Sequence, residues 1–501
     1  MRGESALGNT TSMRRGAVVR ERCRRVRALA ALTALVTAVA LPVAAHVAGD
    51  ALRYTSPNDI TERCVMLTHM PGGVYSERDA AQERALCAVD FYDNAHALCP
   101  KVFSTSPGTL VYDISRGEFA GRPQQFEDAQ CAHVSPVKRG AVGEPIMFKM
   151  TMNDRRTSAT FATSALLYYH FSRYLAASVH VPVSVFRAMD KDVHRARVSQ
   201  RGIALSAHRK GGAMNHAGWE ILVAAERNPS SYPATDELFT ADRSQVHGVL
   251  LQPHGDRYGP EFNGTRRSGW GAGQNRDFQE TAPFLALRSA LPLVEAIDHG
   301  IHVAADDTML RQAMRHGVSH EQMVFWMQEL TEITLLDYIF SQQDRIGNID
   351  QLAWWYWVDD GTVRRQPSSG TAVPAAIAAH HPLRIKRTEL NDNDAGGRVP
   401  YANFTKTTDM LGKIRHYRAE TYRRLLRLAK DFDTRGPLYD YVRDTFGLSA
   451  RQFGQLVDNT LKATSLLRES CHKGRLVFDL DPHAFLVRGE ATVESIDCDE
   501  P

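Results

Sequence analysis

Short apolar runs and one helical pattern alternate between residues 136 and 256. Segments 143–152, 179–189 and 247–253 are apolar runs of strand length. Segment 157–178 repeats apolar residues at the helical period instead. The order predicts strands arranged around one amphipathic helix, and so a β-rich part of the chain.

Helical periodicity dominates from residue 281 onward. Residues 319–343 carry a long apolar stripe that follows Ser319, a good N-cap residue. Residues 352–365 are typical of two strands joined by an Asp-Gly turn, and helices return over 407–470. A β-rich part that precedes an α-rich part predicts a bilobal α+β fold.

The chain has 501 residues, which is too long for one ordinary globular core. Apolar residues make up 43% and charged residues 23%, an ordinary globular composition that excludes disorder over the whole length and a polytopic membrane protein. The formal net charge is only +3, so charge gives no reason to expect a nucleic-acid partner. Lysine is scarce, with 11 of the 60 basic residues, and each lysine is therefore informative.

The first 45 residues have the layout of an export signal. Residues 1–27 are rich in arginine, and residues 28–45 carry no charge and end in small residues. Eighteen uncharged, mostly apolar residues are also just enough to span a bilayer. The sequence therefore predicts either a cleaved signal peptide or a single N-terminal membrane anchor, and in both cases export to a secretory lumen, the periplasm or the extracellular space.

Cysteine usage agrees with export. Six cysteines follow the leader, and an even number in an oxidising compartment predicts up to three disulfides. Their clustering favours pairs within 64–131 and a pair near the C-terminus, although six cysteines allow 15 connectivities. No Cys/His spacing suggests structural zinc. The six are Cys64, Cys87, Cys99, Cys131, Cys471 and Cys498.

Two polar loops carry the candidate chemistry. The first, Ser341 to Asp350, follows the long helix and holds Asp344 and Asn348. The second, around Asp392 and Asp394, offers oxygen ligands for a hard cation such as Mg²⁺ or Mn²⁺. Taken alone, each loop also fits an ordinary solvated turn.

Together the loops fit phosphoryl transfer. This reaction needs a carboxylate near the attacking hydroxyl, metal ligands, and a lysine on the phosphates. Asp344 is the candidate for the hydroxyl, and Asn348 and Asp392 for the metal. Lys149, inside an apolar strand, must find an anion or point outward from an edge strand, and a phosphate would serve as that anion.

These motifs resemble the atypical protein-kinase-like fold of phosphoinositide lipid kinases, HipA-type kinases and secretory-pathway kinases such as Golgi casein kinase and four-jointed. LLDYIFSQQDRIGN (335–348) is similar to the helix and catalytic loop, and LNDNDAGG (390–397) to the metal-binding Asp and its glycines. The resemblance implies a phosphate-contacting Lys149, a catalytic Asp344, a metal-binding Asn348 and an Asp392 equivalent to the DFG aspartate.

The resemblance also implies a division of the chain. The expected parts are a leader (1–45), a Cys-bearing, disulfide-tied N-terminal extension (46–135), a kinase-like N-lobe (136–256), a kinase-like C-lobe (257–470) and a tail (471–501).

Three features depart from that family pattern. Asn348 follows Asp344 by four residues instead of five, and Asp350 is an alternative ligand. Helix 157–178 contains no acidic residue to pair with Lys149, so the partner is Glu127, Asp128 or Glu220 from elsewhere, or is missing. Gly140 and Gly143 before the Lys149 strand are either a phosphate-covering turn or an ordinary hairpin turn.

The sequence therefore predicts an exported, kinase-like phosphotransferase. It would use ATP with Mg²⁺ or Mn²⁺ and act on a hydroxyl of a protein or a glycan. The alternatives are a pseudokinase that binds partners without catalysis, a nucleotidylyltransferase on the same fold, and a metal-dependent hydrolase built on Asp392 and Asp394.

Overall fold

The computed structural model describes residues 47–133 and 135–501. The predicted signal peptide or anchor lies outside this range. No helix in the described part of the chain is both long and apolar enough to cross a membrane.

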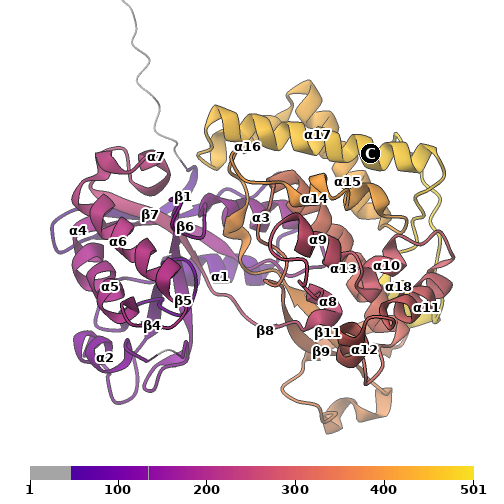
Figure 1. Ribbon diagram of the computed structural model, residues 1–501, viewed down its shortest axis with the longest axis horizontal. Helices are drawn as coiled ribbons and strands as arrows, with labels where there is room; N and C mark the ends of the chain where they lie inside the picture. Colours follow the sequence, from indigo (N-terminus) through magenta and orange to yellow (C-terminus); the bar gives the residue numbers. More distant parts are fainter. Residues whose placement is uncertain (1–46, 134) are drawn as a thin grey trace, which may run out of the picture. The chain divides into compact units, whose positions relative to one another are not determined.

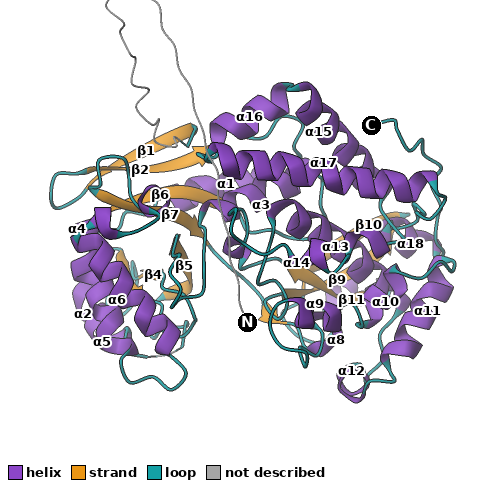
Figure 2. Ribbon diagram, turned by 45° about the horizontal axis from the view of Figure 1, so that its top comes forward, coloured by secondary structure: helices purple, strands orange, loops and turns teal. Residues whose placement is uncertain are grey.

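An antiparallel sheet of seven strands forms the N-terminal half (Figures 1 and 2). The three strands predicted from apolar runs, near 143–152, 179–189 and 247–253, are all present, as β5, β6 and β7. Residues assigned to the Cys-bearing extension supply β1 to β4 of the same sheet. In sheet order the strands are β1 (Gly49–Thr55), β2 (Thr61–Leu67), β6 (Ser184–Asp190), β7 (Gln245–Leu251), β5 (Val142–Met150), β4 (Thr109–Asp113) and β3 (His96–Pro100).

Helices accompany this sheet, among them the predicted helix within 157–178. That helix is α3, which is buried along nearly its whole length and packs on β6 and β7. The helices of this half are α1 (Glu77–Cys87), α2 (Pro123–Gln130), α3 (Thr163–Tyr174), α4 (Lys191–His194), the π-helical η1 (Arg195–Ser199), α5 (Gln200–Ser206), α6 (Ala213–Arg227), η2 (Pro229–Ser231) and α7 (Thr235–Leu238).

A second, smaller sheet stands within the helical half. Its order is β10 (Thr362–Pro367), β9 (Asp350–Asp359) and β11 (Leu383–Glu389), with β8 (Asp256–Arg257) pairing with the start of β9. The predicted Asp-Gly hairpin is confirmed, since Asp360 and Gly361 have positive φ between β9 and β10.

The helical half is built around α13 (His320–Phe340), which packs against α10, α17, α18 and β11. Ser319 caps it as predicted, by accepting a hydrogen bond from the Gln322 amide. The other helices are α8 (Pro260–Asn263), α9 (Ala272–Phe278), α10 (Ala282–Leu287), α11 (Leu293–Ala304), α12 (Thr308–Ala313), η3 (Ala375–His380), η4 (Asn393–Ala395), α14 (Phe404–Thr407), η5 (Leu411–Lys413), α15 (Ala419–Thr434), α16 (Pro437–Thr445), α17 (Ala450–His472) and α18 (Pro482–Arg488).

Helix α13 is enclosed more completely than an apolar stripe alone predicts. Every residue from Gln322 to Phe340 is buried, including Glu329 and Glu332. The Glu329 carboxylate accepts hydrogen bonds from Arg387 and Thr388 on β11, and that of Glu332 from the amides of Ser178 and Val179. A helix enclosed on all sides is a fixed support for the loop that follows it.

Three disulfides are present. They join Cys64 to Cys87, Cys99 to Cys131, and Cys471 to Cys498. The expected pairing within 64–131 and near the C-terminus is therefore confirmed, and the first two bonds lie within the β1–β4 region. The α+β fold class with a β-rich N-terminal half and a helical C-terminal half is confirmed as well.

Candidate active site

Lys149 lies on β5, an inner strand of the seven-stranded sheet. β4 and β7 pair with β5 on its two sides, so the alternative of a lysine pointing outward from an edge strand is wrong. Its side chain is only 8% exposed. An ammonium at such a position needs anionic partners, since burial of an unpaired charge is costly.

Two carboxylates of the second predicted loop supply those partners. Lys149 Nζ lies 2.9 Å from Asp392 Oδ1 and 3.0 Å from Asp394 Oδ1. Burial alone would lower the pKa of Lys149, but Asp394 and Asp392 raise it above its usual value. Burial alone would raise the pKa of Asp392, but Lys149 and then Lys101 hold it well below its usual range. Both the ammonium and the Asp392 carboxylate are therefore charged at neutral pH.

A buried arginine ties the two predicted loops together. Arg345 forms an ion pair with Asp337 of α13, with 3.0 Å between Nη2 and Oδ1. The same guanidinium donates to the Asn391 carbonyl at 2.8 Å and to Asn393 Oδ1 at 2.8 Å. The loop around Asp392 is thus fixed to the end of α13, from which the Asp344 loop departs.

Asp344 lies on this first loop, and its carboxylate is partly exposed. Its Oδ1 accepts a hydrogen bond from Trp270 Nε1 at 3.0 Å. Burial raises the pKa of Asp344 and the charges of Asp392 and Asp394 raise it further, against the lowering effect of the Trp270 bond. A carboxylate oriented by one donor and raised in basicity is suited to accept a proton from a hydroxyl.

Asn348 and Asp350, the alternative ligands of the first loop, both face one cation. The guanidinium of Arg257 lies 2.6 Å from Asn348 Oδ1, 2.6 Å from Asp350 Oδ1 and 3.5 Å from Asp392 Oδ2. The structure therefore brings these three side chains together although they lie up to 44 positions apart in sequence.

This oxygen donor set fits a divalent cation. Amide and carboxylate oxygens are the ligands that Mg²⁺ and Mn²⁺ prefer, and their convergence on a guanidinium shows that the position suits positive charge. Within residues 47–133 and 135–501 no group of three His, Cys, Asp or Glu side chains could hold a metal by itself.

Lys101 is a site residue that the sequence analysis missed. It is buried at the end of β3, and its Nζ makes a weak contact of 3.8 Å with Met147 Sδ. Burial and then the charge of Lys149 lower its pKa, while Asp392 and Asp394 act in the opposite direction. The scarcity of lysine, together with the turn-rich segment 104–108 that follows, is the signal in the sequence that could have identified it.

The β3–β4 turn, and not the turn before β5, lies at the Lys149 end of the sheet. Thr109 of β4 pairs with Phe148, which places residues 101–108 next to Lys149. Gly140 precedes β5 and Gly143 is its second residue, at the end of the strand where Val142 pairs with Asp113. Gly143 is therefore about 20 Å from Lys149 at the usual rise per residue. Gly140 instead packs against Phe119. The structure thus leaves these two glycines outside the cluster.

None of the three carboxylates suggested as the partner of Lys149 reaches it. Glu127 binds Arg197 and Arg201, Asp128 binds Arg201, and Glu220 lies near His216. The second acid at Lys149 is Asp394.

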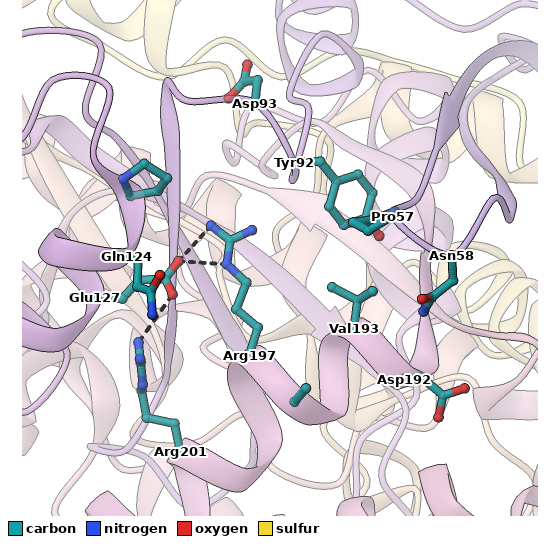
Figure 3. A pocket seen from close by; sticks show the side chains of 12 residues that line it. Pro57, Asn58, Tyr92, Asp93, Gln124, Glu127, Asp192, Val193, Arg197 and Arg201 are labelled. Atoms are coloured by element: carbon teal, nitrogen blue, oxygen red, sulfur yellow. Dashed lines mark hydrogen bonds and ion pairs between the residues drawn. The ribbon is translucent and has the colours of Figure 1, made fainter.

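A cavity of about 670 Å³ lies elsewhere, against α2, η1 and α5 (Figure 3). Its arginines, Arg197 and Arg201, already bind Glu127, as the dashed lines in Figure 3 show. Neither Lys149 nor any of the candidate residues of the two polar loops lines it. The cluster around Lys149 is the better candidate for chemistry, because it joins the two loops that the sequence singles out, whereas the arginines of the cavity are already paired with Glu127.

The chain is similar in structure to two solved structures of Golgi casein kinase. The structure with Mn/ADP bound is 10% identical in sequence to this chain. The match covers 81% of this chain and 79% of that chain, with a TM-score of 0.41. The second structure is 9% identical in sequence. That match covers 85% of each chain, with a TM-score of 0.39. No family model and no curated protein matches the sequence.

Proposed function

We propose that the protein is an exported, ATP-dependent phosphotransferase that moves the γ-phosphoryl group to a hydroxyl of a protein or a glycan. One observation carries this proposal. Lys149, Asp392 and Asp394 form one hydrogen-bonded cluster that links an inner strand of the N-terminal sheet to the loop after β11. Lysine and aspartate on facing elements are what a nucleotide triphosphate with its metal requires.

The charges of the cluster suit the substrates. Lys149 and Lys101 provide two ammonium groups for the phosphates, and Asp344 provides a carboxylate for the acceptor. Asn348 and Asp392, with Asp350 or Asp394, would hold Mg²⁺ or Mn²⁺, which when bound neutralises charge on the phosphate oxygens. In the transfer, the acceptor oxygen forms a bond to the γ-phosphorus, the bond to the bridging oxygen of ADP breaks, and the hydroxyl proton passes to Asp344.

Three disulfides support export, because such bonds persist in oxidising compartments. A secretory lumen, the periplasm and the extracellular space all fit. A hydroxyl on an exported protein or on its glycans is the acceptor that such a compartment offers.

A binding module without catalysis is the second candidate. It is favoured by the absence of any acidic residue on α3, which leaves Lys149 without a helix carboxylate. Nucleotidylyl transfer on the same fold is the third candidate. The mass of the product distinguishes it from phosphorylation, because it adds AMP instead of a phosphate.

The test incubates the purified protein with ATP, MnCl₂ and two acceptor sets, a mixture of exported proteins and a panel of oligosaccharides, and measures product masses. The proposal predicts the addition of phosphate to one set, lost in Asp344→Asn and Asp392→Asn. Asparagine suits the left-handed conformation of Asp392, φ 49°, so the backbone is spared. Asp360→Asn, at an exposed left-handed position with φ 45°, is the matched control. Addition of AMP, or no product with either set, would contradict the proposal.

A further inference from the structure

The guanidinium of Arg257 binds the same oxygen atoms that are suited to a divalent cation. Nε lies 2.6 Å from Asp350 Oδ1, Nη1 lies 2.6 Å from Asn348 Oδ1, and Nη2 lies 3.5 Å from Asp392 Oδ2. Nη1 also donates to the Gly347 carbonyl. Every nitrogen of the guanidinium thus faces an oxygen of the candidate metal site.

The backbone holds Arg257 in this position. β8 pairs with β9, and the register sets Arg257 directly opposite Asp350. Gly255, with φ 99°, turns the chain from β7 into β8, and a side chain there would collide with the Gln351 carbonyl. The side chain of Arg257 is nevertheless 44% exposed, so it can leave the acids without unpacking a core.

Arg257 and a metal ion exclude each other at this position. Ligand oxygens lie about 2.0–2.6 Å from Mg²⁺ or Ca²⁺, well inside the distance of a hydrogen bond. Oxygen atoms that bind such an ion would leave Arg257 within a few ångströms of a second positive charge, where repulsion is strong. The carboxylates can therefore bind either the Arg257 guanidinium or the divalent metal ion, but not both at once.

We infer that Arg257 is an internal competitor that blocks the metal site until a nucleotide is present. The nucleotide relieves the competition because its phosphate oxygens are strong acceptors for a guanidinium and for the metal. Metal and nucleotide then bind with positive coupling, and free Mg²⁺ or Mn²⁺ alone occupies the site poorly. The role of the nucleotide rests on the proposed function; the competition for the acids does not.

The test is a MnCl₂ titration without nucleotide, in which bound Mn²⁺ is measured by electron paramagnetic resonance and stability by thermal unfolding. Arg257→Gln removes the competing charge. Arg257→Lys keeps the positive charge but has fewer hydrogen-bond donors. It replaces Arg257→Gln in the test if the glutamine variant unfolds. Arg266→Gln, which removes a neighbouring guanidinium that lies against Gly347, is the matched control.

We expect Arg257→Gln to bind Mn²⁺ at a concentration about tenfold lower than the unaltered protein needs. Because Mn²⁺ then stabilises the folded variant more strongly, MnCl₂ should also raise its unfolding midpoint by more. Arg257→Lys should lie between the two, Arg266→Gln should match the unaltered protein, and adding Asp392→Asn to Arg257→Gln should abolish the gain. Equal Mn²⁺ binding by Arg257→Gln and the unaltered protein would overturn the inference.

A second arm repeats the titration with ATP. The expected result is that ATP narrows the difference between Arg257→Gln and the unaltered protein. If ATP leaves that difference unchanged, the coupling is overturned. Failure of ATP to bind any variant would contradict the proposed function instead, because the arm without nucleotide tests the competition by itself.

Discussion

Lys149 Nζ donates a hydrogen bond to Asp394 Oδ1 at 3.0 Å, across 245 positions of sequence. Asp394 is as buried as the lysine, with 8% of each side chain exposed. Helix α3 offers Lys149 no carboxylate. Asp394 supplies one instead, from the loop that also carries Asp392. The orientation of Lys149 and the position of the loop around Asp392 are in this way coupled through one ion pair.

Asp394→Asn tests that pair. The variant keeps the shape of the side chain but removes one of the two charges that hold Lys149, and so weakens its orientation toward phosphate. We expect ATP binding in the presence of Mn²⁺ to weaken about tenfold, a loss of about 1.4 kcal/mol. Isothermal titration measures it, with Asp360→Asn as the control; unchanged affinity would show that Asp392 alone positions the lysine.

Lys101→Met should have opposite effects on stability and binding. Its ammonium is buried, and burial lowers its pKa, so its removal should raise the unfolding free energy by about 1–3 kcal/mol. The same change should weaken ATP binding about tenfold, the loss of one charged phosphate contact. Denaturant unfolding and ATP titration together check both signs.

The matched control for Lys101 is Lys138→Met. Lys138 is also buried with a lowered pKa, but it donates to the His133 carbonyl outside the cluster. Its substitution should leave ATP affinity unchanged. A Lys101 variant that binds ATP as well as the Lys138 variant does would remove Lys101 from the site.

Trp270→Phe should shift the pH dependence of transfer. Asp344 must be ionised to accept a proton, so activity falls as pH drops through its pKa, which burial already raises. The Trp270 hydrogen bond lowers that pKa, so without it the acidic limb of the profile moves to higher pH and kcat/KM falls on the acidic side of the profile. A pH–rate profile of ATP turnover checks this, and an unmoved limb would mean that Asp344 is not the titrating base.

Arg345→Met should destabilise the protein by about 3–5 kcal/mol, because it removes the only cation paired with the buried Asp337 among the described residues and leaves it the Tyr168 hydroxyl alone as a side-chain donor. It should also abolish ATP binding, since Arg345 holds the Asn391–Asn393 loop. Arg387→Met breaks a comparable buried pair with Glu329. Denaturant unfolding should show similar losses for both, and only Arg345→Met should lose ATP binding under conditions where it is folded.

Local patterns were enough to predict much of the fold. The strand around Lys149, helix α3, the capped start of α13 and the Asp-Gly hairpin each follow from spacing within a short segment. The pairing of β1–β4 with the same sheet does not, because strand pairing joins residues that are distant in sequence. Burial of α13 on all sides likewise depends on neighbours that no local pattern reveals.

The candidate site divides in the same way. Asp344, Asn348, Asp392 and Asp394 lie in two polar loops that local patterns identify. Lys101, Trp270 and Arg257 each reach the cluster through contacts set by the tertiary fold, and Trp270 in particular comes from a loop with no distinctive spacing. One of the two interpretations of Gly140 and Gly143, a phosphate-covering turn, would place them beside Lys149, but the register places them at the other end of its strand.

Thermal unfolding of the purified protein with ATP and MnCl₂, added separately and together, tests the central claim most directly. A ligand that binds only the folded state raises the midpoint by mass action. We predict a rise that requires both ATP and Mn²⁺, that is lost in Asp392→Asn, and that persists in Asp360→Asn. An unchanged midpoint in every condition, or an equal rise in the Asp392 variant, would contradict a nucleotide site built on Lys149, Asp392 and Asp394.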